Sequence, residues 1–215
     1  MRWNQIKSDK GDKMRFYNFV CGVLRAFSKI FFRMEITGQE NIPDDGNLII
    51  VANHKSVLDP VFMMASVRNR RIIPVAKKEL FKIPVLRLIL KKLEVIAIDR
   101  ENPGLSTIKG ILKQIKSGRV LGIFPEGTRS ETEEFLPAKP GVALFALKTK
   151  ANILPMSIIS TYRPFSKVKV VIGETIDMTE YNTRKVDKKE YQEIAQIMMD
   201  AVEKNYLENK NGIKK

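Results

Sequence analysis

The stretch NLIIVANHKSVLDPVFMMASV, residues 47–67, joins a short apolar run to a helical pattern. Residues 47–53 read as a buried strand, and a helix is expected to begin at Pro60, where proline is favoured in the first turn. The turn between them contains His54, the only histidine of the 215 residues. A buried strand that leads directly into a helix is typical of βαβ units, in which helices cover a parallel sheet.

The same alternation of strands and helices continues along the chain. Further strands are expected at 71–77, 95–99, 119–124 and 152–159, and further helices at 84–93, 105–118, 140–150 and 191–207. Residues 167–176 alternate between apolar and polar residues in the manner of an edge strand. The polar ends of the chain are weakly patterned, so disorder is expected only there. The pattern predicts an α/β fold with a mostly parallel central sheet flanked by helices.

An amphipathic helix is expected before this fold, between Arg15 and Arg33. Its apolar residues recur at three- and four-residue steps, whereas Arg25, Ser28 and Lys29 occupy much of the remaining surface. The segment is too short and too charged to span a membrane, but it suits the membrane interface. A helix packed on its own domain is the alternative. The expected division is a membrane-associated segment at 1–33 and a single α/β domain at 34–215.

The composition restricts the classes of ligand. The chain has 38 basic and 24 acidic residues, a formal net charge of +14, which attracts nucleic acid, anionic lipid or an acidic carrier protein. A nucleic-acid-binding protein is disfavoured because one tryptophan, five tyrosines and no recognisable binding motif offer little for base recognition. One histidine and one cysteine, Cys21, cannot assemble the usual zinc sites, so no metal is expected.

Polar residues follow four of the expected strands. His54, Lys77, Arg100 and Glu126 each stand at or just after a strand end. Ligands of open α/β sheets bind at the carboxyl ends of the strands, so we expect these four residues to meet at one edge.

His54 and Asp59 allow two interpretations. Asp59 can fold back across the turn, hold one imidazole nitrogen as a donor and leave the other nitrogen to accept a proton. In the alternative interpretation Asp59-Pro60 is only a favourable helix start and His54 is a turn residue.

The stretch FPEGTRS, residues 124–130, leaves another buried strand and has the composition of an anion site. Gly127 allows close approach of the backbone, Thr128 offers a hydroxyl, and Arg129 offers a planar fork for two phosphate oxygens. A surface turn is the alternative. The chain has no GxSxG, GxxxxGK[ST] or GxGxxG motif. A base and an anion site without cofactor suit the activation of a hydroxyl on a phosphorylated substrate.

Five blocks in this order, NHKSVLDP, VAKKELFKIPVL, VIAIDR, FPEGTRS and ILPMSI, resemble the glycerolipid acyltransferases, and most closely the bacterial 1-acyl-glycerol-3-phosphate acyltransferases. The resemblance covers about residues 35 to 175 and implies the glycerol-3-phosphate acyltransferase-like fold. Many members of this family have a glycine in place of Arg87 and another near Glu94, so this chain carries extra charge between residues 84 and 94.

The resemblance implies that His54 is the general base and that Asp59 orients it. It implies contacts to the phosphate of the acceptor from Glu126, Gly127, Thr128 and Arg129, and also from Arg100 and Lys77. The implied reaction transfers an acyl group from acyl-CoA or acyl carrier protein to lysophosphatidic acid, without a cofactor, and gives phosphatidic acid. The same fold could acylate another lysophospholipid, glycerol 3-phosphate or a lyso-aminolipid. The expected location is peripheral, on the cytoplasmic face of the cell membrane.

Overall fold

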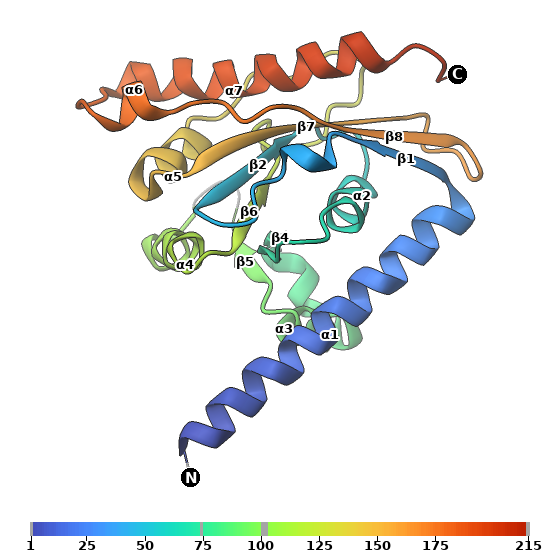
Figure 1. Ribbon diagram of the computed structural model, residues 1–215, viewed down its shortest axis with the longest axis vertical. Coiled ribbons are helices and arrows are strands. Elements are labelled where there is room, and N and C mark those ends of the chain that lie inside the picture. The colour runs from blue at the N-terminus through green and yellow to red at the C-terminus, as the bar shows by residue number, and fades with distance from the viewer. Residues whose placement is uncertain (1, 74, 100–102, 214–215) are drawn as a thin grey trace.

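A central sheet organises the computed structural model, which describes residues 2–73, 75–99 and 103–213 (Figure 1). Within these residues six strands form the sheet, and all neighbours are parallel except β7 and β8. Their order across the sheet is β1 (Arg33–Thr37), β8 (Lys167–Ile172), β7 (Asn152–Ser160), β2 (Leu48–Ala52), β6 (Val120–Ile123) and β3 (Ile72–Ile73). The predicted α/β fold with a mostly parallel sheet is confirmed.

Helices cover both faces of the sheet. Ile49 and Val51 of β2 face a core formed with α4 (Leu105–Lys116), α5 (Gly141–Thr149) and α7 (Lys188–Asn209). Leu48 and Ile50 face the other core, which includes Phe62 of α2 (Asp59–Ser66). Alternate residues of β2 therefore enter different cores, which explains why all five of its residues are apolar and buried. Two single-turn elements, η1 (Gln39–Asn41) and α6 (Thr179–Asn182), lie in the connections.

The expected strand at 71–77 is divided between two sheets. β3 joins the central sheet beside β6, whereas β4 (Val75–Lys77) pairs with β5 (Ile96–Ile98) in a separate two-stranded sheet. The chain between β4 and β5 forms η2 (Lys78–Lys82) and α3 (Pro84–Lys92). A continuous apolar pattern does not reveal a transfer between sheets, so the expectation that four strand ends share one edge was wrong for Lys77.

The strand β8 lies inside the sheet, between β1 and β7, and the prediction of an edge strand there was wrong. Its alternation has another cause. Val168, Val170 and Ile172 are buried in the α2-side core, whereas Lys169 points to the other face and donates to the carbonyls of Asn209 and Asn211. The outer position beside β8 belongs to β1.

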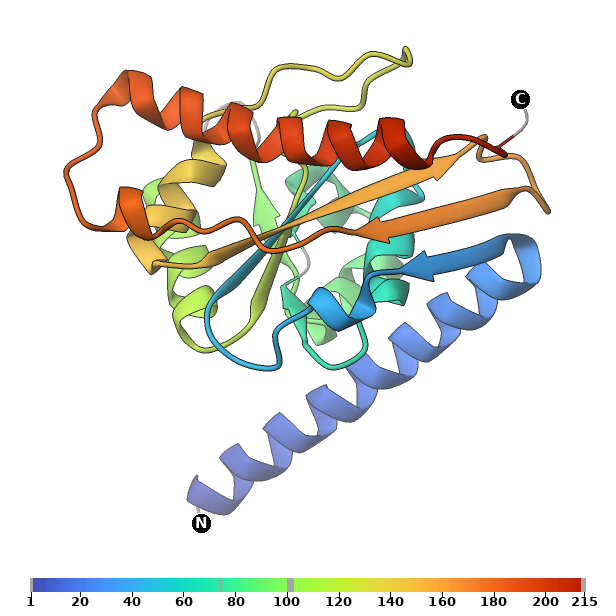
Figure 2. The same cartoon turned by 45° about the horizontal axis from the view of Figure 1, so that its top comes forward.

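The first helix, α1 (Arg2–Phe31), begins well before the expected Arg15, so the polar N-terminal end is helical rather than disordered. It runs diagonally along the α2 side of the molecule, and its N-terminus projects beyond the sheet (Figures 1 and 2). Tyr17 and Cys21 are buried against the domain, whereas Phe19 and Ile30 are exposed. The inner side of the helix therefore packs on its own domain, and membrane association of the outer side stays a prediction. Among the described residues, no helix has the length and apolar character needed to cross a membrane.

Candidate active site

The edge of the sheet at which β2 and β6 end holds the candidate site. The two strands are parallel neighbours, with Val51 opposite Ile123, so the chain segments that follow them meet. Asn53 continues the pairing of β2 with its side chain, which accepts from the amide of Ile158 at 2.8 Å and donates to its carbonyl oxygen at 2.9 Å. This side-chain bridge fixes the point at which the backbone turns away and presents His54.

His54 and Asp59 contact each other directly. The distance from His54 Nδ1 to Asp59 Oδ2 is 3.0 Å, and both side chains are buried. The same oxygen accepts hydrogen bonds from the amides of Lys55 and Ser56, at 2.7 Å each. Asp59 is the first residue of α2, yet its carboxylate folds back into the turn. Of the two interpretations, the geometry supports the orienting carboxylate. A carboxylate partner keeps the proton on Nδ1 and leaves Nε2 as the acceptor.

Tyr162 completes the surroundings of Asp59. Its hydroxyl donates to Asp59 Oδ1 at 2.8 Å. Burial, together with the negative charge and hydrogen bond of Asp59, raises the pKa of Tyr162 far above its usual value, so the hydroxyl keeps its proton and remains a donor. Tyr162 follows β7, 103 residues away in the chain, and has a positive φ of 58°. No local sequence pattern identifies it as part of the site.

Glu126 has a different place from the expected phosphate contact. Its side chain is buried, and its two oxygens accept from the amides of His54, at 2.7 Å, and Leu136, at 3.1 Å. The amide of Ser130 in turn donates to the carbonyl oxygen of His54 at 2.8 Å. Because a carboxylate repels a phosphate and this one is occupied by backbone donors, Glu126 is a positioning residue that joins the two turns around His54.

The middle of the FPEGTRS turn, at Thr128 and Arg129, is open to solvent. Gly127 has a φ of +73°, and a Cβ there would lie 2.6 Å from Lys139 Cε, so both its backbone conformation and the lack of a side chain are required. Thr128 and Arg129 are exposed. Within the described chain, the Arg129 guanidinium makes no hydrogen bond or ion pair, which leaves its fork available to an anion.

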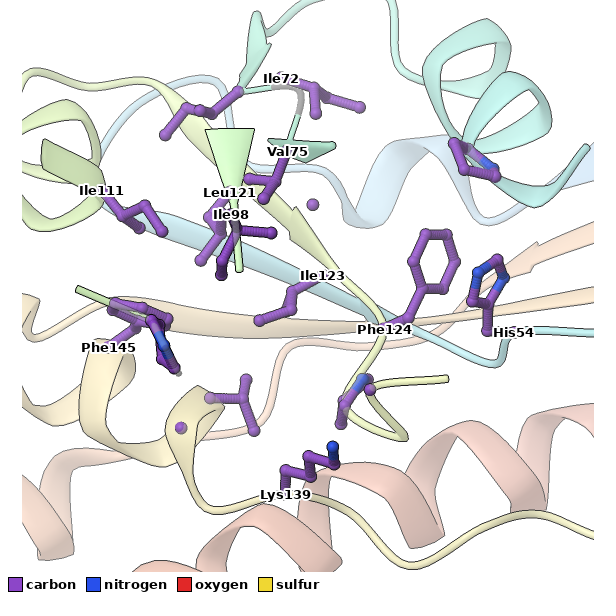
Figure 3. A pocket seen from close by; sticks show the side chains of 18 of the residues that line it. His54, Ile72, Val75, Ile98, Ile111, Leu121, Ile123, Phe124, Lys139 and Phe145 are labelled. Atoms are coloured by element: carbon purple, nitrogen blue, oxygen red, sulfur yellow. The ribbon is translucent and has the colours of Figure 1, made fainter. Parts of the chain in front are cut away.

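Lys139 is a cation that the sequence reasoning missed. Its amide donates to the carbonyl oxygen of Pro125 at 2.8 Å, and its side chain passes over Gly127. In Figure 3 the amino end of Lys139 points toward the turn that follows Phe124. No motif contains Lys139, because it reaches the site only through the return of the chain after residues 131–138.

Of the two further expected residues, Lys77 is not part of this cluster. Lys77 ends β4 in the separate sheet, is exposed, and has its amino group 3.7 Å from Glu79. Arg100 lies outside the described residues.

An apolar cavity of about 350 Å³ opens beside His54. His54 stacks on Phe124, with ring centroids 4.3 Å apart, and these two lie at one end of the view in Figure 3, whereas Ile111 and Phe145 lie at the other. Val75 and Ile98 of the small sheet form part of its wall. Among the described lining residues, His54 and Lys139 carry the titratable side chains. The site therefore combines an oriented base, nearby cations and room for an apolar chain.

Comparison with known proteins identifies the family. Residues 33–159 match the family described as Acyltransferase. The 1-acyl-sn-glycerol-3-phosphate acyltransferase of Bacillus subtilis (strain 168) is 32% identical, over 77% of this chain and 84% of the relative. The enzyme of the same name from Borreliella burgdorferi is 36% identical, over 61% of this chain and 53% of the relative, so the matched part spans about half of that longer protein.

A solved structure shows the same likeness in three dimensions. The crystal structure of the 1-acyl-sn-glycerophosphate (LPA) acyltransferase PlsC from Thermotoga maritima superposes with a TM-score of 0.72 at 28% identity, covering 93% of this chain and 83% of that one. The family match extends from β1 through β7 and includes the turns that hold His54, Asp59 and Arg129. With its family match over residues 33–159 and this shared fold, the chain belongs to the acyltransferase family.

Proposed function

We propose that the protein transfers an acyl group from an acyl thioester to the sn-2 hydroxyl of 1-acyl-glycerol-3-phosphate, which gives phosphatidic acid. The observation that carries the proposal is the His54–Asp59 pair, 3.0 Å apart, at the end of an apolar cavity. The names of the relatives from Bacillus subtilis and Thermotoga maritima support this choice of acceptor.

In the proposed mechanism, His54 Nε2 takes the proton of the acceptor hydroxyl while the hydroxyl oxygen attacks the thioester carbonyl carbon. The new C–O bond forms, the C–S bond then breaks, and the proton passes from the imidazolium to the departing sulfur. Asp59 holds the Nδ1 proton and stabilises the imidazolium between these two transfers. A positioned base of this kind contributes about 10²–10⁴ in rate.

The substrates would divide between the cavity and the open turn. An acyl chain suits the apolar cavity, and the phosphate of the acceptor suits the exposed Arg129 together with Lys139, which lines the cavity beside the turn. Gly127 and Thr128 belong to the same turn and offer backbone and hydroxyl contacts. Lys77 and Arg100 stay predicted phosphate contacts. Acyl-CoA and acyl carrier protein are both proposed as donors, because both present a thioester.

The proposed location is the cytoplasmic surface of the cell membrane, with the outer side of α1 as a docking face. Phe19, Val23 and Ile30 are exposed on that side, and a formal net charge of +14 favours anionic lipid. No nucleic-acid partner is proposed.

The test is a mass-spectrometric assay of the purified protein and its His54→Ala variant. Each is offered lysophosphatidic acid, other lysophospholipids and glycerol 3-phosphate, with acyl-CoA or acyl carrier protein as donor. We expect phosphatidic acid as the main product and a loss of about 10²–10⁴ in turnover for His54→Ala. The variant should remain folded at the assay temperature, as its circular dichroism spectrum can verify, and should bind vesicles as the wild type does.

Two results would contradict the proposal. Retention of more than about a tenth of wild-type turnover in a folded His54→Ala variant would remove His54 from the role of base. Faster turnover of another acceptor than of lysophosphatidic acid would retain the chemistry and reject the proposed substrate.

A further inference from the structure

The helix α3 and the turn before it expose an unusual number of large apolar side chains. Val85 is 71% exposed and Leu88 is 70% exposed. Leu80, Ile83 and Ile89 are also exposed, whereas Leu90 is buried on the inner side of the helix. The domain therefore covers only one of the two apolar sides of α3, and the other side faces solvent. A contiguous apolar surface of this kind on a folded protein is typical of an interaction site.

Cations surround this outer surface. The segment from Leu80 to Leu93 contains no acidic residue, and its charged residues are Lys82, Arg87, Lys91 and Lys92. The side chains of Lys82, Arg87 and Lys91 make no hydrogen bond or ion pair with the rest of the described chain. Lys92 lies over the ring of Phe16 in α1, at 4.3 Å from the centroid. Exposed apolar side chains beside unpaired cations match the side chains expected of a helix that lies in an anionic membrane interface.

The position of α3 links this surface to the candidate site. The helix lies in the connection between β4 and β5, and Val75 and Ile98 of these strands form part of the cavity wall. Its C-terminal end packs on α1, because Leu93 is buried in one cluster with Tyr17 and Cys21. Figure 1 shows α3 beside α1 and on the opposite side of the sheet from α7. The outer surfaces of α1 and α3 are therefore neighbours.

We propose that the segment Leu80–Lys92 is a membrane-contacting surface, which inserts Val85 and Leu88 among the lipids of an anionic monolayer. The strand pair β4–β5 is then held at the bilayer, and lipid chains pass between the bilayer and the cavity with little exposure to water. The link to the cavity rests on the proposed function, whereas the membrane contact does not. An acidic carrier protein would form ion pairs with the cations but would leave the exposed side chains of Val85 and Leu88 without an apolar partner. Anionic lipid offers partners to both, so lipid fits the whole surface better.

The first experiment measures binding of a Val85→Glu/Leu88→Glu double variant to phosphatidylcholine vesicles with and without phosphatidylglycerol. Both positions are exposed, so the domain does not need them for packing. We expect the partition coefficient on anionic vesicles to fall at least about tenfold, because two apolar contacts are lost and two negative charges are gained.

The matched control is Ile197→Glu/Leu207→Glu on α7. These residues are 44% and 46% exposed, and α7 covers the opposite face of the sheet (Figure 1). The control should bind vesicles as the wild type does. Equal losses in both double variants would mean that charge alone weakens binding and would overturn the proposal.

A second arm uses fluorescence and does not depend on the charged variant. The chain has one tryptophan, Trp3, so Trp3→Phe/Leu88→Trp carries a single reporter on α3. Its emission should shift to shorter wavelength when anionic vesicles are added, and brominated lipids should quench it. Unchanged emission from protein that co-sediments with the vesicles would show that α3 remains in water, which overturns the proposal.

Activity then separates the membrane from a carrier protein as the partner of α3. With acyl-CoA as donor, Val85→Glu/Leu88→Glu should lose activity on lysophosphatidic acid held in vesicles and keep it on a short-chain, monomeric acceptor. A loss confined to acyl carrier protein as donor, with vesicle binding intact, would assign the surface to that protein instead. If the wild type binds vesicles through α3 but transfers no acyl group, only the proposed function fails.

Discussion

Asp59 receives hydrogen bonds from four donors, and these donors come from two different parts of the chain. His54, Lys55 and Ser56 belong to the same turn as Asp59, whereas Tyr162 lies in the segment that follows β7. The local donors give Asp59 its rotamer, and Tyr162 satisfies the remaining oxygen. A buried carboxylate with every oxygen bonded stays in one place, which is what orientation of an imidazole requires.

Removal of the Tyr162 hydroxyl should test this arrangement. In Tyr162→Phe, Asp59 Oδ1 loses its donor in a buried site, so the free energy of unfolding should fall by about 1–3 kcal/mol. Turnover should fall as well, while the KM for the acceptor changes little. Urea unfolding and steady-state kinetics measure the two effects. Tyr206→Phe is the control, because Tyr206 is only half-buried and packs against Phe135.

Arg129 allows the binding of the phosphate to be separated from proton transfer. Arg129→Lys keeps the charge but loses the bidentate fork, so kcat/KM for lysophosphatidic acid should fall about ten- to a hundredfold, mainly through KM. With a neutral monoacylglycerol as acceptor, where the enzyme accepts it, kcat/KM of Arg129→Lys should be nearly the same as that of the wild type. Steady-state kinetics with both acceptors test the role, with exposed Arg68→Lys as control. An equal loss with the neutral acceptor would mean that Arg129 supports the turn rather than binding phosphate.

Site residues could be predicted from the sequence where they are close together in the chain, because the turn between them then determines their contact. His54 and Asp59 share one turn, so their contact could be expected from spacing and from the proline that follows. Tyr162 and Lys139 could not be found in this way, because each reaches the site from a distant segment. Glu126 was recognised as a site residue but given the wrong partner, since the pattern does not show that its carboxylate is buried beneath backbone amides.

At the level of elements, the apolar pattern located most strands and helices but not their sheets. The run at 71–77 gives no sign that its halves belong to different sheets, because both halves pack on the same apolar cavity through Ile73 and Val75. The edge position assigned to β8 failed for a similar reason. Alternation of apolar and polar residues shows only that one face of a strand is more buried than the other. An interior strand such as β8 has this pattern when its second face is covered only in part, here by the C-terminal segment that Lys169 contacts.

Glu94, at the junction between α3 and β5, shows how one residue can connect several elements. Its backbone has a positive φ of 58°, a conformation that favours glycine. Its carboxylate pairs with Arg119 at 2.7 Å, Arg71 at 3.0 Å and Lys13 of α1 at 3.5 Å. Burial acts to raise the pKa of Glu94, but the hydrogen bond and charge of Arg119 and the charge of Arg71 outweigh it, so the pKa lies below its usual value.

Two substitutions at Glu94 separate the backbone from the charge. Glu94→Gln keeps the unfavourable φ and loses the ion pairs, so we expect it to lower the free energy of unfolding by about 1 kcal/mol at neutral pH. Glu94→Gly loses the same pairs but fits the conformation, so it should be more stable than Glu94→Gln. Urea unfolding measures both differences.

The pH dependence of this effect has a definite sign. Because the folded pKa of Glu94 is depressed, its stabilisation is present above the usual glutamate pKa and disappears as the pH falls through the lower folded value. The difference between wild type and Glu94→Gln should therefore shrink in acid. A difference that is constant from neutral pH to about pH 3 would exclude the charge as its cause.

On the scale of the whole molecule, the proposed membrane binding combines the net charge with the exposed apolar surfaces of α1 and α3. In the proposed docking, the formal charge of +14 would attract the protein to anionic surfaces from a distance, whereas Phe19 and Leu88 would make contact only on arrival. These two contributions respond differently to salt, since ions screen charges but leave apolar contacts in place.

Salt should therefore weaken vesicle binding without abolishing it. Between about 0.1 M and 1 M salt the screening length falls from about 10 Å to about 3 Å, so affinity for phosphatidylglycerol vesicles should drop by at least about tenfold. Residual binding at high salt should be weaker in Val85→Glu/Leu88→Glu, in which only the apolar contacts of α1 are left. Co-sedimentation over a salt series measures both quantities, and complete release of the wild type at high salt would show that apolar insertion contributes nothing.

Cys21 lies on the side of α1 that is buried against the domain, and this position offers a way to follow the helix. It is the only thiol of the chain, it is 1% exposed, and burial raises its pKa, so it should react slowly with thiol reagents while α1 stays in place. The labelling rate in native buffer then measures how often α1 lifts from the domain, without any engineered probe. A lower labelling rate of Cys21 on vesicles would mean that lipid stabilises the packing of α1 on the domain. A higher rate would mean that lipid favours the separation of α1 from the domain.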